Sequence, residues 1–184
     1  GGKILTESNF IIEYLDETFP KISLRPDDPY ELWKMRNWMH KFESILHKNI
    51  NLISFVKQNR MKRYEKFSED ELINFLSRQV NAERKLSFEK RIRHGITEAE
   101  MQFAEDRISE VLDEMDDALQ DKIWLNGPKL SLADISIAPF VERFEANDLK
   151  QLVDWQKRPA LGAWWSRVQE LPSYKTAFNF TIPG

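Results

Sequence analysis

The sequence has no cysteine among its 184 residues and no apolar run approaching the length of a membrane-spanning helix. Without cysteine, the chain has no disulfide, no thiolate zinc site and no cysteine nucleophile, and it is compatible with a reducing cytoplasm. A membrane-spanning helix needs roughly 20 consecutive apolar residues, so we expect no membrane segment. These absences favour a cytoplasmic globular protein, and the 41% hydrophobic content can supply its core.

The sequence also lacks an excess of charge of one sign. Its 27 basic and 30 acidic residues give a formal net charge of −3, whereas nucleic-acid binders usually show a strong positive field. Two basic runs, at 57–66 and 84–93, are interleaved with acidic residues. We therefore interpret both runs as solvated helix surface and expect no nucleic-acid partner.

The chain begins without an initiator methionine or a signal peptide. Gly1-Gly2 followed by Lys3-Ile4-Leu5 has the pattern of a hairpin turn leading into one short strand. A single strand cannot satisfy its backbone hydrogen bonds without a partner. We therefore expect further chain upstream of Gly1.

Helical periodicity dominates the rest of the sequence. We expect a first helix from the Thr6-Glu7-Ser8 turn to about Glu17, with Thr6 or Ser8 as its cap. A proline-rich connector at 20–29 should separate it from a long helix at 30–58. Capping boxes then predict three further helical segments, which begin at Ser68-x-x-Glu71 and end at Gly95, begin at Thr97-x-x-Glu100, and begin at Ser131-x-x-Asp134.

The helix after Ser131 is apolar on nearly every side, which places it at the centre of a bundle. Proline should start two later helices, at Pro159 and Pro172. The fold class expected from these elements is mainly α, with one strand and one helix preceding a helical bundle.

This order of elements resembles the glutathione transferase superfamily over essentially the whole chain. The motifs that carry the resemblance are Leu5-Thr6-Glu7-Ser8, Ile12-Glu13-Tyr14-Leu15-Asp16-Glu17, Leu24-Arg25-Pro26 with Asp28-Pro29, and Leu130-Ser131-Leu132-Ala133-Asp134-Ile135. The long segment holding Arg91-Ile92-Arg93-His94-Gly95 and the Lys157-Arg158-Pro159-Ala160-Leu161 run are similar to bacterial beta-aryl etherase enzymes, which cleave lignin-derived aryl ethers with glutathione.

The resemblance implies three parts. Residues 1–19 would be the end of a thioredoxin-like domain, residues 20–29 a linker, and residues 30–184 the glutathione transferase C-terminal helical domain. It also implies a homodimer, glutathione as cosubstrate and an electrophilic aromatic substrate, with beta-aryl ether cleavage as one such reaction. The thiol-activating residue would lie upstream of Gly1, so no catalytic residue is assigned within the chain.

The resemblance assigns glutathione binding to Glu7 and Ser8. Glutathione presents an α-carboxylate and an α-ammonium at its γ-glutamyl end. The amides of a helix first turn and the Ser8 hydroxyl can donate to the carboxylate, while the Glu7 region can accept from the ammonium. Taken without the family, the same turn is an ordinary helix cap.

Four residues on the early turns of the long helix would face the substrate cleft by family position: Trp33, Arg36, Asn37 and His40. Arg36 could hold the glycyl carboxylate of glutathione or an aryloxide, or it could form a structural ion pair. The tryptophans, including Trp38, Trp164 and Trp165, could wall an aromatic pocket, although core packing is their commoner role.

His40, Glu43 and His47 could share one helix face, a spacing that raises the question of a metal. No fourth ligand accompanies them, so we expect no metal site. A second functional class stays open, because bundles of this type also serve as non-catalytic protein-interaction modules. Failure to bind glutathione would favour that alternative.

Overall fold

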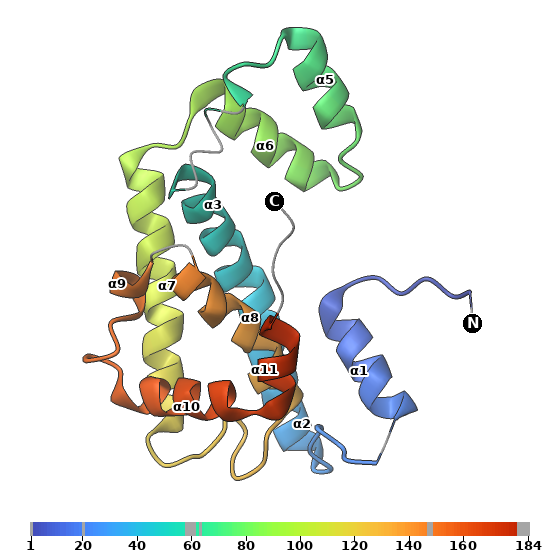
Figure 1. Ribbon diagram of the computed structural model, residues 1–184, viewed down its shortest axis with the longest axis vertical. Helices are drawn as coiled ribbons and strands as arrows, with labels where there is room; N and C mark the ends of the chain where they lie inside the picture. Colours follow the sequence, from blue (N-terminus) through green and yellow to red (C-terminus); the bar gives the residue numbers. More distant parts are fainter. Residues whose placement is uncertain (1, 20, 58–61, 63, 147–148, 180–184) are drawn as a thin grey trace.

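A computed structural model describes residues 2–19, 21–57, 62, 64–146 and 149–179. The chain is mainly helical, as Figure 1 shows. Its helices are α1 (Ser8–Thr18), α2 (Pro29–Lys41), the π-helix η1 (Phe42–His47), α3 (Lys48–Lys57), α5 (Glu69–Ser77), α6 (Ala82–His94), α7 (Glu98–Leu119), α8 (Leu132–Ala146), α9 (Lys150–Val153), α10 (Pro159–Glu170) and α11 (Pro172–Phe178). Within the described residues, no helix is long and apolar enough to cross a membrane. The predicted fold class is confirmed.

The first residues differ from the expected strand. Residues 2–6 form neither a helix nor a strand. A strand is stabilised by hydrogen bonds to a neighbour, and none of the described segments lies beside these residues to form a ladder with them. The helix that follows agrees with the prediction, since α1 ends within one residue of the expected Glu17.

The long helix predicted at 30–58 is present as α2, η1 and α3 in succession. Its expected regular α-helical geometry is interrupted at η1, where a π-helical stretch adds an extra residue to the turn. The apolar stripe nevertheless stays on the core side through the interruption, at Met35, Met39, Phe42, Leu46, Ile50 and Ile53, all buried. π-Helical turns occur frequently at functional sites.

The core lies where this stripe meets α7, α8 and α10. The largest contacts join α3 to α7, α10 to α7 and α2 to α8. The buried apolar residues of those partners are Ala104, Ile108, Val111, Leu112, Met115 and Leu119 on α7, Leu132, Ala133, Ile137, Ala138, Val141 and Phe144 on α8, and Leu161, Trp164, Trp165 and Val168 on α10. Trp164 and Trp165 are therefore core residues, and α8 is central, as predicted.

Asp134 fixes the start of α8 inside the bundle. Its carboxylate is 1% exposed and accepts bonds from the Ser131 amide (2.9 Å) and hydroxyl (2.7 Å), the Leu125 amide (3.0 Å) and the Trp164 indole (2.9 Å). Burial raises the pKa of this carboxyl above its ordinary value, against the lowering effect of those hydrogen bonds. The bond from the Ser131 amide to Asp134, which the capping box predicted at Ser131-x-x-Asp134 requires, is thus present and belongs to a larger buried network.

Helices α5 and α6 project from the bundle at the end where α3 finishes (Figure 1). The sequence predicted one continuous segment here, but Asn81 caps a new helix by accepting a bond from the Arg84 amide at 2.9 Å. The capping box of Ser68 with Glu71 and the terminal Gly95 are as predicted. An aromatic cluster joins this hairpin to α3, with ring separations of 5.1–6.1 Å among Phe55, Tyr64, Phe67, Phe75 and Phe88.

Candidate functional site

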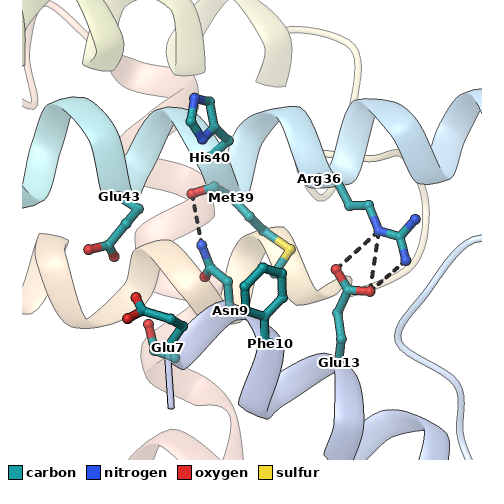
Figure 2. Close-up of a pocket in the computed structure, with 9 residues that line it drawn as sticks. Glu7, Asn9, Phe10, Glu13, Arg36, Met39, His40 and Glu43 are labelled. Atoms are coloured by element: carbon teal, nitrogen blue, oxygen red, sulfur yellow. Dashed lines mark hydrogen bonds and ion pairs between the residues drawn. The ribbon is translucent and has the colours of Figure 1, made fainter.

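A pocket of about 470 Å³ opens between the first turns of α1 and the α2–η1 helix. Its volume lies in the range of about 300–1,000 Å³ that is usual for small-ligand sites. It is lined by Glu7, Ser8, Asn9, Phe10, Glu13, Arg36, Met39, His40 and Glu43 (Figure 2). Four of the six residues predicted for ligand binding line this one pocket, although they come from segments about thirty residues apart.

The turn into α1 has an unusual backbone at Glu7, with φ 66° and ψ 110°. Positive φ is strained for a residue with a Cβ atom, and such strain persists only where the surrounding structure enforces it. Ser8 is the first residue of the helix, and no side chain of the described residues caps this end. The expectation that Thr6 or Ser8 caps the helix is therefore wrong.

The uncapped turn leaves the Ser8 hydroxyl and the first amides of α1 beside the pocket. The backbone of a helix first turn carries amide groups that have no partner within the helix. The positive end of the helix dipole lies at the same turn and favours the binding of an anion. The turn can therefore donate several hydrogen bonds to a carboxylate, while Glu7 supplies a negative charge next to it.

Asn9 joins this turn to the helical bundle. Its side-chain amide donates to the Met39 carbonyl at 3.2 Å, and its carbonyl oxygen accepts from the Ser136 hydroxyl at 3.0 Å. Figure 2 shows the first of these bonds crossing from α1 to α2. Both ends of the amide are thereby used, which fixes the orientation of the side chain and of the turn that carries it.

A second link crosses the pocket between Arg36 and Glu13. The guanidinium contacts the carboxylate in a forked arrangement, with Nη2–Oε2 at 2.6 Å and Nε–Oε1 at 3.1 Å. Its hydrogen bonds to Glu13 raise the pKa of Arg36 despite partial burial. Of the two roles open for Arg36, the structure thus contains the ion pair, which lies on the pocket wall.

The other predicted cleft residues lie differently. His40 lines the pocket, but in Figure 2 its ring projects to the side of the helix away from α1. Trp33 and Asn37 do not line the pocket and are exposed, and the Trp33 ring stacks on Tyr30 at 5.7 Å. Trp38 is half-buried against Phe42 instead.

Glu43 lines the pocket and is bonded to His47. Glu43 Oε1 lies 2.7 Å from His47 Nδ1. In the described part of the chain, no three His, Asp or Glu side chains are placed to hold a metal ion. Glu43 and His47 accordingly form a pair, and His40 is separate from it.

Sequence reasoning missed Asn9, Glu13 and Glu43 as pocket residues. Asn9 and Glu13 are four residues apart and so share one face of a helix whose neighbouring positions are largely apolar. Polar residues at helical spacing directly after the Glu7-Ser8 turn were the available signal. Glu43 lies in η1, whose π-helical geometry no sequence pattern indicated.

Residues 83–165 match the family described as glutathione S-transferase, C-terminal domain. Protein LigF of Sphingobium sp. strain SYK-6 is 26% identical over 97% of this chain and 70% of its own length. The crystal structure of beta-etherase LigF superposes with a TM-score of 0.83 over 96% of this chain and 74% of that chain. The chain is therefore similar to glutathione transferases over nearly its whole length. The expected resemblance to the superfamily and to beta-etherases is confirmed.

Further glutathione transferases are also similar to this chain. Glutathione S-transferase omega-1 of Rattus norvegicus is 26% identical over 96% of this chain, which spans 57% of that protein. A glutathione transferase of Burkholderia graminis, crystallised with two glutathione molecules bound per subunit, has a TM-score of 0.67 at 18% identity over 98% of this chain and 62% of that one. The latter likeness concerns the fold alone.

Proposed function

We propose that this chain contributes the γ-glutamyl part of a glutathione site and the substrate-side helical bundle of a glutathione-dependent transferase. The observation that carries the proposal is the strained, uncapped Glu7-Ser8 turn, which opens directly into the pocket between α1 and α2. The substrate would be an electrophilic aromatic compound. The site residues within the chain would be Glu7 and Ser8 for glutathione and Arg36 for a second anionic group.

The turn matches the two charges of the γ-glutamyl group. The carboxylate would accept from the first amides of α1 and from the Ser8 hydroxyl, whereas the ammonium would lie against the Glu7 carboxylate. Within the pocket, the reaction partners would be held in attacking geometry, which can supply a large part of the rate enhancement. The bonds of Asn9 to Met39 and Ser136 fasten one side of this pocket to the bundle.

The outer face of α1 supports a further domain upstream. Outside the pocket, Tyr14 (46%) and Leu15 (45%) on α1 and Phe19 (68%) directly after it are large apolar residues that are exposed. Exposed apolar side chains gathered on one short segment favour a contact with another element. We assign this contact to the rest of a thioredoxin-like domain, of which residues 1–19 would be the end and which the 20–29 linker would join to the bundle. The upstream part of that domain would also carry the thiol-activating residue.

Aryl ether cleavage is the reaction that the similarity to LigF favours. LigF is a beta-etherase and is similar over nearly the whole of this chain. In such a reaction, the glutathione sulfur would replace an aryloxide at carbon. The proposal also includes a cytoplasmic homodimer in which the exposed Tyr30–Trp33 stack of α2 contacts the partner. Light scattering on the intact protein tests the dimeric state.

Retention on immobilised glutathione, followed by calorimetric titration, tests the proposed site. In the full-length protein, Ser8→Ala should weaken glutathione binding by about tenfold, because a hydrogen bond to a charged group contributes roughly 1.5 kcal/mol. Ser166→Ala, an exposed serine on α10, serves as the matched control and should bind as the unmodified protein does. Lack of any glutathione binding by the unmodified protein would instead favour a protein-interaction module.

A further inference from the structure

The face of α8 that contacts Asn9 of α1 continues along α8 beyond that contact. Three residues of α8 at helical spacing contact the facing segments: the Ser136 hydroxyl donates to Asn9 at 3.0 Å, the Phe140 ring lies 5.6 Å from the His47 ring, and Arg143 Nη1 donates to Asn51 at 2.9 Å. The first of these contacts is beside the Glu7-Ser8 turn. The second lies one turn of α8 further on, so this face of α8 extends from Asn9 to His47.

His47 is both anchored and accessible. Its Nδ1 lies 2.7 Å from Glu43 Oε1, and each side chain is 42% exposed. Glu43 itself lines the pocket. A carboxylate bonded to one ring nitrogen fixes the ring orientation and balances the charge of the imidazolium, leaving the other nitrogen for a different partner. This is the arrangement required of a positioned proton donor.

Phe140 supplies the matching apolar surface. It is half-buried and tilted by 45° against the His47 ring. Aromatic rings favour offset or edge-on neighbours at centroid separations of about 4.5–7 Å. Phe140 and His47 lie outside the residues that line the pocket, so an aryl group would have to extend past Glu43 to meet this aromatic side chain and the hydrogen-bond donor beside it.

We infer that His47, oriented by Glu43, donates a proton to the leaving oxygen of an aryl ether whose ring packs against Phe140. The inference rests on the proposed function and adds a residue to it. In the step, the glutathione sulfur gives an electron pair to the ether carbon and forms the C–S bond. The C–O bond breaks with its electrons on oxygen, and that oxygen takes the proton of the His47 imidazolium. Solvent then reprotonates the ring.

Leaving-group basicity separates this role from a structural one. Positioned acids contribute most where the leaving oxygen is basic, and general acid catalysis is worth about 10²–10⁴-fold. In the full-length protein, His47→Gln should lower kcat for an ether that releases a weakly acidic phenol by about 10²-fold. For the matching nitrophenyl ether, whose leaving group needs no proton, the loss should stay within about threefold on the same reasoning. Glu43→Gln should give a smaller loss with the same dependence on the leaving group.

His94→Gln, an exposed histidine on α6, is the matched control and should leave both rates unchanged. His47→Asn, together with thermal unfolding of each variant, separates a folding defect from a chemical one. Equal losses for the two ethers would overturn the inference. So would an unmodified protein that conjugates glutathione to a chlorinated nitrobenzene but cleaves no aryl ether, an outcome that leaves the proposed transferase function intact.

Discussion

Arg36 and Glu13 join the two segments that form the pocket. The guanidinium of Arg36 on α2 meets the carboxylate of Glu13 on α1 with Nη2–Oε2 at 2.6 Å, and their side chains are 51% and 17% exposed. The pair therefore has one partner in solvent contact and one mostly covered. Together with the Asn9 bonds, it holds α1 against the bundle at two points of the pocket rim.

Arg36→Lys should weaken glutathione binding about two- to fivefold, because a lysine cannot reproduce the forked contact and an exposed pair contributes about 0.2–1 kcal/mol. Calorimetric titration of the full-length protein measures the change. Lys34→Gln removes the Lys34–Glu31 pair from the same helix and is the control. If both variants bind glutathione alike, the Arg36–Glu13 pair has no role in the site.

The strain at Glu7 predicts opposite effects on stability and on binding. Glycine adopts positive φ without a Cβ clash, so Glu7→Gly should raise the free energy of unfolding by about 1 kcal/mol while weakening glutathione binding through loss of the carboxylate. Glu7→Ala should lose binding without gaining stability. Chemical denaturation and titration of the two variants distinguish strain from charge. A glycine variant no more stable than the alanine variant contradicts the strained assignment.

Asn9 should matter at both ends of its side chain. Asn9→Asp keeps an acceptor for the Ser136 hydroxyl but places an oxygen against the Met39 carbonyl, which should cost about 1–3 kcal/mol of stability. Ser136→Ala should cost less, because it removes only the second bond. Denaturation of the single and double variants gives the coupling between them. Additive effects would show that the amide does not act as one bridge.

Much of the fold was predictable because its signals are local. The capping boxes at Ser68, Thr97 and Ser131 and the apolar stripe from Met35 to Ile53 depend on residues within a few turns. The π-helix and the break before Asn81 were not predicted. A π-turn depends on how the helix packs on its neighbours. The break before Asn81 has no proline or glycine to mark it, so the sequence predicts one continuous helical segment there.

The site was predicted only in part for a related reason. Glu7 and Ser8 came from a contiguous motif, whereas Glu13, Asn9 and Glu43 become pocket residues only when α1 is laid across α2. Trp33 and Asn37 lie on the predicted helix, but their exact rotation about its axis depends on packing, and it turns them to solvent. The assignment of ligand-binding roles to the residues of the pocket stays a prediction.

The junction of α6 and α7 should be sensitive to acid. Hydrogen bonds from Lys90 and then from Thr97 lower the pKa of Glu100 to about 2. A carboxyl whose folded pKa lies below its unfolded value stabilises the fold above the unfolded pKa, and this contribution disappears as the pH falls towards about 2. Between pH ~4.5 and that value, Glu100→Gln should flatten the loss of stability. Identical acid-unfolding curves for the two proteins would contradict this.

Asp134 should be the most sensitive single position in the bundle. Removing its carboxylate by Asp134→Ala leaves the Leu125 and Ser131 amides and the Trp164 indole buried without an acceptor. Each unsatisfied buried donor costs about 1–3 kcal/mol, so the sum approaches the whole stability of a typical domain. We expect a protein that is unfolded or aggregated at physiological temperature, as measured by circular dichroism. Asp121→Ala, on the exposed turn after α7, should unfold at the same temperature as the unmodified protein. Trp164→Phe deletes a single donor to the same carboxylate and should retain the fold with reduced stability. A fully stable Asp134→Ala protein would show that the network does not hold α8 in place.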